Sequence, residues 1–311
     1  MATHWYPYIS SQISSITGTS ILTWEGIDPS NKRQKMLYPY ELTNSSTGIV
    51  SYTKNYSNTE NAVVGIGEFS TVGLTNNIPS LQKNNVTWGA AFWTMDVIGI
   101  MAEAGIKYAQ KHILNGKIIP GVLSTYTFPT IGFQGERLPL SYAYELYAKY
   151  FGNKIVHSYS DQPQLLNVHA SLDDWKRLKV LLINKTGNNQ NVILNINNFL
   201  HKNLVIFHSL TIPNRDNFER LSLDERGIAK ITTYDRTIER NLSFSITPFT
   251  ATIITFFPDC ADYNKGNLNC DEKIDSIDIN IAINSWLEKF YNLNQDSIND
   301  EEDLTIILKN F

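Results

Sequence analysis

The hydrophobic and polar positions change character along the chain, and the most regular pattern lies at 62–113. Residues 62–67 form an apolar run that predicts a buried strand ending at Glu68. The apolar segment at 88–104 predicts a buried helix, which Gly105 is suited to cap because glycine accepts the left-handed conformation. Residues 106–113 predict another strand. Strand, helix and strand in about fifty residues are typical of a βαβ unit of a parallel sheet.

The flanking segments extend this pattern and then change it. Residues 4–9 predict a strand, and residues 138–150 predict an amphipathic helix that stops near Gly152. Beyond this glycine, short apolar runs alternate with clusters of turn residues. These runs predict strands at 154–157, 166–170, 178–184, 191–196, 204–208, 228–233 and 250–257. Short strands at this spacing are typical of a β-sandwich.

The last part of the chain contains two copies of one pattern at a fixed offset. In each copy, oxygen-bearing side chains occupy positions 1, 3, 5, 9 and 12 of a twelve-residue loop, which is the donor set that calcium prefers. The donors are Asn267, Asn269, Asp271, Asp275 and Asp278 in the first loop and Asn292, Asn294, Asp296, Asp300 and Asp303 in the second. We therefore expect structural Ca²⁺ in these loops. The alternative is an acidic, solvated tail that binds nothing.

Each loop runs into a segment with apolar residues at helical spacing. These residues are Ile279, Ala282, Ile283 and Trp286 after the first loop and Leu304, Ile307, Leu308 and Phe311 after the second. The spacing predicts two helices, each with its apolar residues on one face. Both loops depart from the usual pattern at position 6, where a sharp turn favours glycine but Glu272 and Ser297 stand. Position 8 also differs between the copies, with Ile274 in one and Asn299 in the other.

Composition describes an ordinary globular protein. The chain has 311 residues, of which 42% are hydrophobic and 18% charged, so it is long enough for two domains and a small module. Its net charge of −4 gives no reason to expect nucleic acid or an anionic membrane as a partner. No apolar run is long enough to span a bilayer, and the first residues do not resemble a signal peptide.

Other features favour an extracellular or secretory location. Five sequons for N-glycosylation begin at Asn44, Asn55, Asn85, Asn184 and Asn241, although a chain so rich in Asn and Ser forms several by chance. The two cysteines, Cys260 and Cys270, either close a disulfide, as expected in a secreted protein, or remain free thiols. A secretory location without a signal sequence suggests that Met1 is not the true beginning of the protein.

Glu68 is the candidate catalytic residue because it stands where a buried strand stops, and functional residues of parallel α/β barrels gather at such ends. Alone, a glutamate there is more often a solvated surface residue. The order of the elements, however, resembles the last three βα units of the catalytic barrel of retaining glycoside hydrolases of clan A. The motifs are His-Trp-Tyr-Pro at 4–7, Gly-Ile-Gly-Glu-Phe-Ser at 65–70, the helix at 93–105 and Val-Leu-Leu-Ile-Asn-Lys at 180–185. Within the clan, the chain is most similar to the heparanase and β-glucuronidase family over residues 1–257.

The resemblance implies roles for individual positions. Glu68 matches the nucleophile. His4 and Tyr6 match the end of the preceding strand, and Gln110 and His112 match the last strand, where polar groups bind the sugar.

Three residues of the helix at 93–105 match positions that serve packing or the end of the helix rather than chemistry. They are Trp93, Asp96 and Gly105. The tail has a loop followed by a helix, twice over, with no helix before either loop. It thus resembles the dockerin module of polysaccharide-degrading assemblies, which implies a cohesin-like protein domain as partner.

These patterns together predict an α/β plus all-β chain of three parts. The parts are the C-terminal portion of a (β/α)8 TIM barrel at 1–151, a β-sandwich at 152–257 and a small α-helical dockerin-like calcium module at 259–311. A retaining mechanism needs a second carboxyl group as acid/base, which the resemblance places after Asn at the end of an earlier strand. No Asn-Glu pair precedes Glu68, and Glu25, Glu41 and Glu60 stand at no recognisable strand end.

Three functions fit the sequence. The first is a retaining hydrolase of a polysaccharide or glycosaminoglycan-like substrate, without a catalytic cofactor, of which this chain is a fragment lacking the acid/base. The second is a non-catalytic carbohydrate-binding or assembly protein, tethered by its dockerin-like module. The third is another member of the clan, such as an endoglucanase or arabinofuranosidase.

Overall fold

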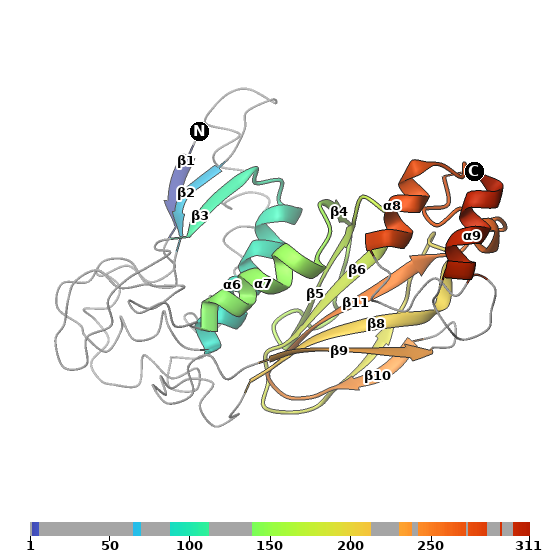
Figure 1. Cartoon of the computed structure of the whole chain (residues 1–311). Helices are drawn as coiled ribbons and strands as arrows, with labels where there is room; N and C mark the ends of the chain where they lie inside the picture. The colour runs from blue at the N-terminus through green and yellow to red at the C-terminus, as the bar shows by residue number, and fades with distance from the viewer. Residues whose placement is uncertain are drawn as a thin grey trace, which may run out of the picture.

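The structure is a computed structural model that describes residues 2–5, 65–69, 88–111, 139–212, 230–237, 242–271, 273–284, 293 and 301–311. Over these residues the chain forms a mixed α/β arrangement of layers, with a small helical module at one end (Figure 1). A parallel sheet lies on one side of two helices, and a larger antiparallel sheet lies on the other side.

The parallel sheet contains β1 (Ala2–Trp5), β2 (Gly65–Phe69) and β3 (Tyr108–Lys111) in the order β1-β2-β3. Helix α6 (Trp88–Glu103) joins β2 to β3, which run parallel, so the predicted βαβ unit is confirmed. Strand β2 continues one residue beyond Glu68, the position at which the sequence predicted its end. Strand β1 ends at Trp5, and the rest of the predicted strand at 4–9 lies outside the described residues.

Gly105 caps the C-terminal end of α6, as predicted. This glycine has φ of +79°, a conformation that residues with a side chain rarely adopt. Its N–H donates to the carbonyl oxygen of Ala102 at 3.0 Å, and the N–H of Ile106 donates to that of Met101 at 3.0 Å. These two hydrogen bonds form a Schellman motif, which satisfies carbonyl groups at the end of the helix.

Helices α6 and α7 (Pro139–Tyr150) form the middle layer. Helix α6 is apolar nearly all round, which is typical of a helix buried on more than one side. One hydrophobic cluster runs from Phe69 at the end of β2, through both helices, to Leu181, Ile183 and Ile253 of the antiparallel sheet. The core therefore joins the two sheets through the helices.

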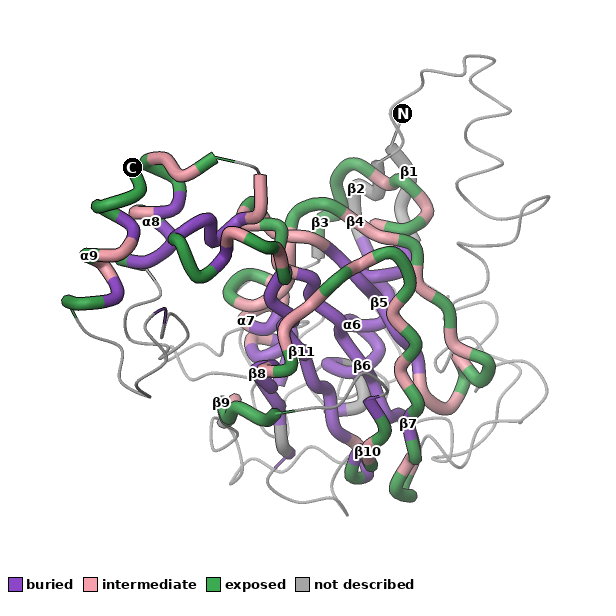
Figure 2. Tube along the Cα trace, turned by 90° about the vertical axis from the view of Figure 1, so that its right-hand side faces the viewer, coloured by how far each residue is buried: buried purple, intermediate pink, exposed green. Residues whose placement is uncertain are grey.

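Over the described residues the antiparallel sheet has six strands, and each predicted run other than 191–196 overlaps one of them. Its order is β4 (Lys154–Val156), β5 (Leu166–Leu172), β6 (Leu178–Asn184), β11 (Thr250–Pro258), β8 (His201–Thr211) and β9 (Lys230–Thr237). The central strands β6 and β11 are buried along their whole length, whereas β9 at the edge is largely exposed (Figure 2).

A second sheet pairs β7 (Gln190–Leu194) with β10 (Leu242–Ile246), antiparallel. Val192, Leu242 and Ile246 pack on the face of the large sheet that points away from the helices. The sequence prediction missed β10, although its Leu-Ser-Phe-Ser-Ile sequence alternates between apolar and polar residues. Because this second sheet has two described strands, a complete β-sandwich stays a prediction.

Asn184, the last residue of β6, begins one of the sequons, but it is fully buried. Its Nδ2 donates to the carbonyl oxygens of Asn188 at 2.9 Å, Ile246 at 3.2 Å and Thr247 at 2.9 Å. The amide that a glycan would modify is therefore committed to the fold, and Asn184 is not a glycosylation site in the folded protein. The other four sequon asparagines lie outside the described residues.

The C-terminal module contains the 3-10 helix η4 (Tyr263–Lys265) and the helices α8 (Ser276–Asn284) and α9 (Glu301–Asn310). A disulfide joins Cys260 to Cys270, which decides between the two alternatives for these cysteines. The small core consists of Tyr263, Leu268, Ile281, Ala282, Leu293 and Ile307. None of the described helices is long and apolar enough to cross a membrane.

The predicted apolar faces of α8 and α9 are only partly buried. Ala282 and Ile307 are buried, whereas Ile283, Leu308 and Phe311 are 58%, 55% and 65% exposed. The two helices have nine and ten residues, and only part of each apolar face packs in the small core. Trp286 lies outside the described residues.

Helix α6 lies close to the large sheet at Gly99, where an added Cβ atom would overlap the imidazole of His169. We expect Gly99→Ala to lower the free energy of unfolding by about 1–3 kcal/mol, the usual cost of overpacking. This sign is informative because alanine favours a helix over glycine by ~1 kcal/mol. Denaturant unfolding measures the change. In the control Gly187→Ala, the new Cβ would lie 3.6 Å from the Phe249 ring, an ordinary contact, and an equal loss in both variants would contradict the expectation.

Candidate functional site

The predicted sugar site lies at the carboxyl end of the parallel sheet. His4 of β1 pairs in register with Glu68 of β2, and Phe69 pairs with Lys111 of β3. Gln110, which precedes Lys111, is exposed and stands at the same end of the sheet. The backbone thus brings His4, Glu68 and Gln110 together on adjacent strands, whereas Tyr6 and His112 lie outside the described residues.

Strand β2 is irregular at the position of Glu68. Ile66 pairs with Thr3 on one side and with Ala109 on the other, but both registers shift before the next pair. The extra residue falls at Gly67–Glu68, so a β-bulge interrupts both ladders there. Bulges bend a strand and re-aim its side chains, and they are frequent beside active sites.

The chemistry that these strands offer is that of one carboxylate. Glu68 is the only acidic residue in β1, β2 and β3. One carboxylate is able to act as nucleophile or base, but a retaining glycosidase also needs a second carboxyl group about 5–5.5 Å away. The described part of this sheet does not contain that group.

Phe69, the neighbour of Glu68, attaches the end of β2 to α6. Its side chain is 1% exposed, and its ring centroid lies 6.5 Å from that of Trp93, with the planes at 44°. A tilted aromatic pair at this distance is a favourable arrangement. A shift of α6 would therefore displace the end of β2, where Glu68 stands.

A second group of polar residues surrounds Asp96 of α6, inside the protein. Lys185 Nζ donates to Asp96 Oδ2 at 2.5 Å, and Asn167 Nδ2 donates to Oδ1 at 2.6 Å. His169 Nε2 lies 3.0 Å from the same Oδ1. All four residues are at most 6% exposed, so substrate does not reach them. We call these four residues, with Glu103, the Asp96 cluster.

Glu103 closes the cluster at its rim. Its Oε1 lies 2.9 Å from His169 Nδ1 and accepts a hydrogen bond from Ser158 Oγ at 3.0 Å. Both ring nitrogens of His169 therefore face carboxylate oxygens. Only the imidazolium form donates from both nitrogens, so the geometry itself indicates a charged His169.

The first predicted calcium loop gathers oxygen-bearing side chains around one turn. The Oδ1 atoms of Asn267 and Asn269 both accept the N–H of Asp271, at 3.2 and 3.1 Å. Asn269 Nδ2 also donates to Asp271 Oδ2 at 2.9 Å. Both asparagine side chains are buried, so these oxygens point into the loop.

Asp278 holds this loop to helix α8. Its Oδ1 accepts the N–H groups of Leu268 at 2.7 Å and Asn269 at 3.3 Å, and its Oδ2 accepts that of Asp275 at 2.9 Å. Asp275 Oδ1 in turn accepts the N–H of Ile277 at 2.8 Å. Asp278, the third residue of α8, thus bonds the N–H of Asp275 before the helix, as in a capping box, while Asp275 caps the N–H of the second helical residue.

The second loop repeats one of these bonds, since Asp303 Oδ1 accepts the N–H of Leu293 at 2.5 Å. Asn292, Asn294, Asp296 and Asp300 lie outside the described residues. Among the residues that are described, no three His, Cys, Asp or Glu side chains are close enough to hold a metal by themselves. The donor set of the first loop, two amide oxygens with three carboxylates, nevertheless has the chemistry that Ca²⁺ prefers.

No protein-family model matches the chain, and no curated protein is similar to it in sequence. Solved structures do match. The α-L-arabinofuranosidase of Thermotoga maritima aligns over 73% of this chain and 50% of its own, with 14% identity and a TM-score of 0.55. A family 44 xyloglucanase of Paenibacillus polymyxa aligns over 82% and 46%, with 15% identity and a TM-score of 0.54. A bifunctional glucanase-xylanase from a metagenome library aligns over 83% and 43%, with 17% identity and a TM-score of 0.52.

The chain has the fold of part of a glycoside hydrolase. It spans about half the length, or less, of each of these three enzymes. At such low identity the likeness concerns the fold and not the residues of the site.

Three members of the Asp96 cluster, Asp96, His169 and Lys185, have shifted pKa values. Burial would raise the pKa of Asp96, but the charges of Lys185 and His169 and their hydrogen bonds hold it below its ordinary value. Burial lowers the pKa of Lys185 against the attraction of Asp96, a shift that weakens the same ion pair. Hydrogen-bond donors occupy both oxygens of Asp96 and leave no place for a carboxyl proton. The Asp96–Lys185 pair is therefore charged.

His169 shifts in the other direction. Burial lowers its pKa, but the hydrogen bonds and charges of Asp96 and Glu103 outweigh burial and raise it above the ordinary value. The sequence prediction assigned Asp96 to packing and did not find its partners. Asp96 and Lys185 are 89 positions apart, and no local pattern marks such a pair.

The raised pKa of His169 predicts a pH dependence of stability. The stabilisation by imidazolium is complete below the unfolded pKa of about 6.5 and is lost as the pH rises through the folded pKa. We expect His169→Gln to cost about 1.5–3 kcal/mol at pH 6 and less at pH 9, measured by denaturant unfolding. His157→Gln, at an exposed histidine, is the control. A cost that stays constant with pH would contradict this account.

Proposed function

We propose that this chain is part of a retaining glycoside hydrolase in which Glu68 is the nucleophile. The observation that supports the proposal most is the position of Glu68. It stands at a bulge at the carboxyl end of the middle of three parallel strands, within a fold shared with glycoside hydrolases. Those strands are the ones that the sequence prediction assigns to a partial (β/α)8 barrel.

The proposed mechanism has two steps. The carboxylate of Glu68 attacks the anomeric carbon, and the bond to the leaving oxygen breaks as an acid protonates that oxygen. Water then attacks the glycosyl-enzyme, giving its proton to the same residue, now a base, and Glu68 is released as carboxylate. We place the acid/base in the half of a glycoside hydrolase that this chain does not span. His4, Tyr6, Gln110 and His112 are proposed to bind sugar hydroxyl groups.

We propose a polysaccharide as substrate. The similar structures are an arabinofuranosidase, a xyloglucanase and a glucanase-xylanase. Their names favour an endoglucanase or arabinofuranosidase over an enzyme of the heparanase family, which was the first expectation from the sequence. The disulfide between Cys260 and Cys270 supports an extracellular or secretory location.

The nucleophile can be tested without the acid/base, because a dinitrophenolate leaves without protonation. We expect dinitrophenyl 2-deoxy-2-fluoro-glycosides to release one equivalent of dinitrophenolate and to leave the fluorosugar on Glu68. A panel of xyloside, glucoside, cellobioside and arabinofuranoside reagents, with peptide mass spectrometry, measures the adduct on the full-length protein. Glu68→Gln should remove the burst.

The matched control is Glu60→Gln, which changes an upstream glutamate that matches no motif of the family. Label on another residue, or labelling that survives Glu68→Gln, would refute the assignment. Binding of the polysaccharide without any adduct would instead support the second hypothesis, a non-catalytic carbohydrate-binding protein.

We further propose that the C-terminal module is dockerin-like, binds calcium and recognises a cohesin-like domain. Asn267, Asn269, Asp271, Asp275 and Asp278 would hold the ion in the first loop. Calcium at 100 times its dissociation constant should then raise the free energy of unfolding of the module by ~2.7 kcal/mol per site. Scanning calorimetry with calcium and with a chelator measures this change.

Two charge-neutralising variants in the same module provide the comparison. Asp271→Asn should weaken calcium binding about tenfold or more, because the number of charged ligands sets the affinity of such loops. Asp262→Asn removes an exposed carboxylate that pairs with Lys265 outside the loop, and it should leave the affinity unchanged. Isothermal titration measures both, and equal effects would contradict the proposed ligands.

A further inference from the structure

We propose that Asp96 is a positioning residue: it locks α6 to the large antiparallel sheet and thereby fixes the end of β2 that carries Glu68. The effect on catalysis rests on the proposed function. The mechanical link from Asp96 to β2 does not, because it depends only on contacts within the fold.

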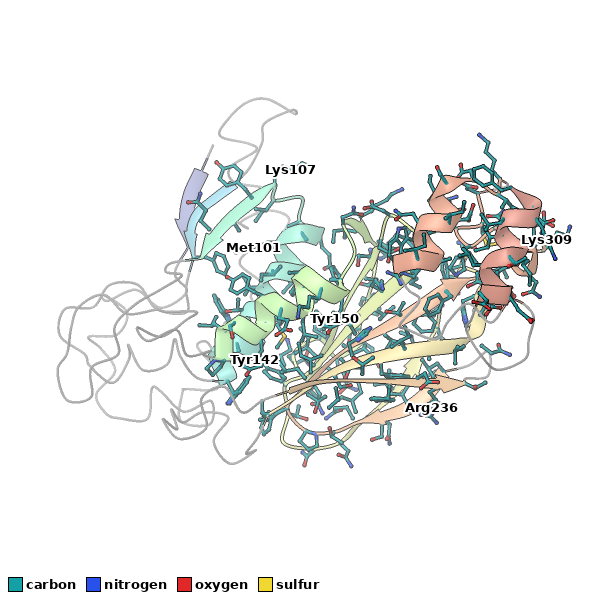
Figure 3. The ribbon with its side chains drawn as sticks, in the orientation of Figure 1. Met101, Lys107, Tyr142, Tyr150, Arg236 and Lys309 are labelled. Atoms are coloured by element: carbon teal, nitrogen blue, oxygen red, sulfur yellow. A yellow bond between two sulfur atoms is a disulfide. The ribbon has the colours of Figure 1, made fainter. Side chains whose placement is uncertain are left out.

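The link passes through two neighbouring side chains of α6. Trp93 packs on Phe69 of β2, and Asp96 binds Lys185, which follows β6. Residues three apart are adjacent on a helix surface. Trp93 and Asp96 are both fully buried, so neither contact has room to move independently of the helix. Figure 3 shows the side chains that fill the space between the two helices and the large sheet.

The need for a polar lock follows from the composition of α6. Asp96 and Glu103 are the only charged residues among its sixteen. An apolar helix in an apolar environment finds similar burial at several rotations and axial positions. The hydrogen bonds on the two oxygens of Asp96 are directional and are satisfied in one arrangement only.

A single stripe of α6 makes this arrangement. Asp96, Gly99 and Glu103 lie at i, i+3 and i+7, on one face. Asp96 and Glu103 bind the two nitrogens of His169, and Gly99 leaves room for its ring between them. His169 therefore makes both contacts at only one rotation of α6 and one position of the helix along its axis.

The test compares hydrogen exchange in the full-length wild-type protein and in Asp96→Asn. We expect the amides of β2 to exchange roughly 2- to 30-fold faster in the variant, while those of β6 and β11 exchange at the control rate. Asp173→Asn is the control, since it removes a partly buried carboxylate in the turn that follows β5, where its described partners are Arg177 and Lys179 of β6 rather than residues of α6. Equal acceleration in β2, β6 and β11, or none in β2, would overturn the proposal.

Glu103→Gln is a milder variant in case Asp96→Asn does not fold. Glu103 is 29% exposed, and its change weakens the lock at its rim. The same selective acceleration of β2, smaller in size, is expected. A uniform response of all strands to Glu103→Gln would also overturn the proposal.

The fluorosugar reagent separates this proposal from the proposed function. Misplacement of Glu68 should lower the labelling rate at saturating reagent, with less effect on the half-saturating concentration. If β2 loosens selectively but the wild-type protein is never labelled, the link stands and the glycosidase proposal fails. If the wild-type is labelled at Glu68 but exchange in the variant is uniform, the glycosidase proposal stands and the link fails.

Discussion

The arrangement of the described layers depends on one buried carboxylate. Asp96 lies on a helix that is otherwise uncharged up to Glu103, and its two oxygens accept hydrogen bonds from residues that belong to the large sheet or follow it. A buried charge of this kind is costly unless every lone pair is used, and removing one partner alone typically costs about 3–5 kcal/mol. Hydrophobic packing brings the helix to the sheet, and the Asp96 cluster selects one alignment among those that packing would accept.

The hydrogen bonds of Asp96 make the helical layer the connection between the two sheets. Helix α6 contacts the parallel sheet through Trp93 and the antiparallel sheet through Asp96. The position of the helix therefore fixes the two sheets relative to each other. A glycosidase nucleophile has to stand within a fraction of an ångström of its productive position. If Glu68 is the nucleophile, as proposed, the antiparallel sheet would contribute to catalysis by holding the helix that packs on β2.

Elements with a strong local pattern were predictable from the sequence, whereas their partners were not. The apolar run of α6, its glycine end and the buried run of β6 are each specified by neighbouring residues, and the structure confirms them. Strand β10 was missed because five alternating residues are a weak signal. The Asp96 cluster joins residues up to 89 positions apart, so no window along the chain contains it. The exposure of Ile283, Leu308 and Phe311 could not be predicted, because periodicity gives the direction of a helix face but not the width that a neighbour covers.

The two repeated loops share a hydrogen bond within the polypeptide that does not involve an ion. Asp278 and Asp303 occupy equivalent positions, both are almost fully buried, and each accepts the N–H of the leucine that follows the first loop position. These aspartates therefore serve the fold first, by closing the loop onto the helix. A carboxylate oxygen that accepts one or two N–H groups keeps a lone-pair direction for a cation. The hydrogen bonds of Asp278 thus order part of the first loop without an ion.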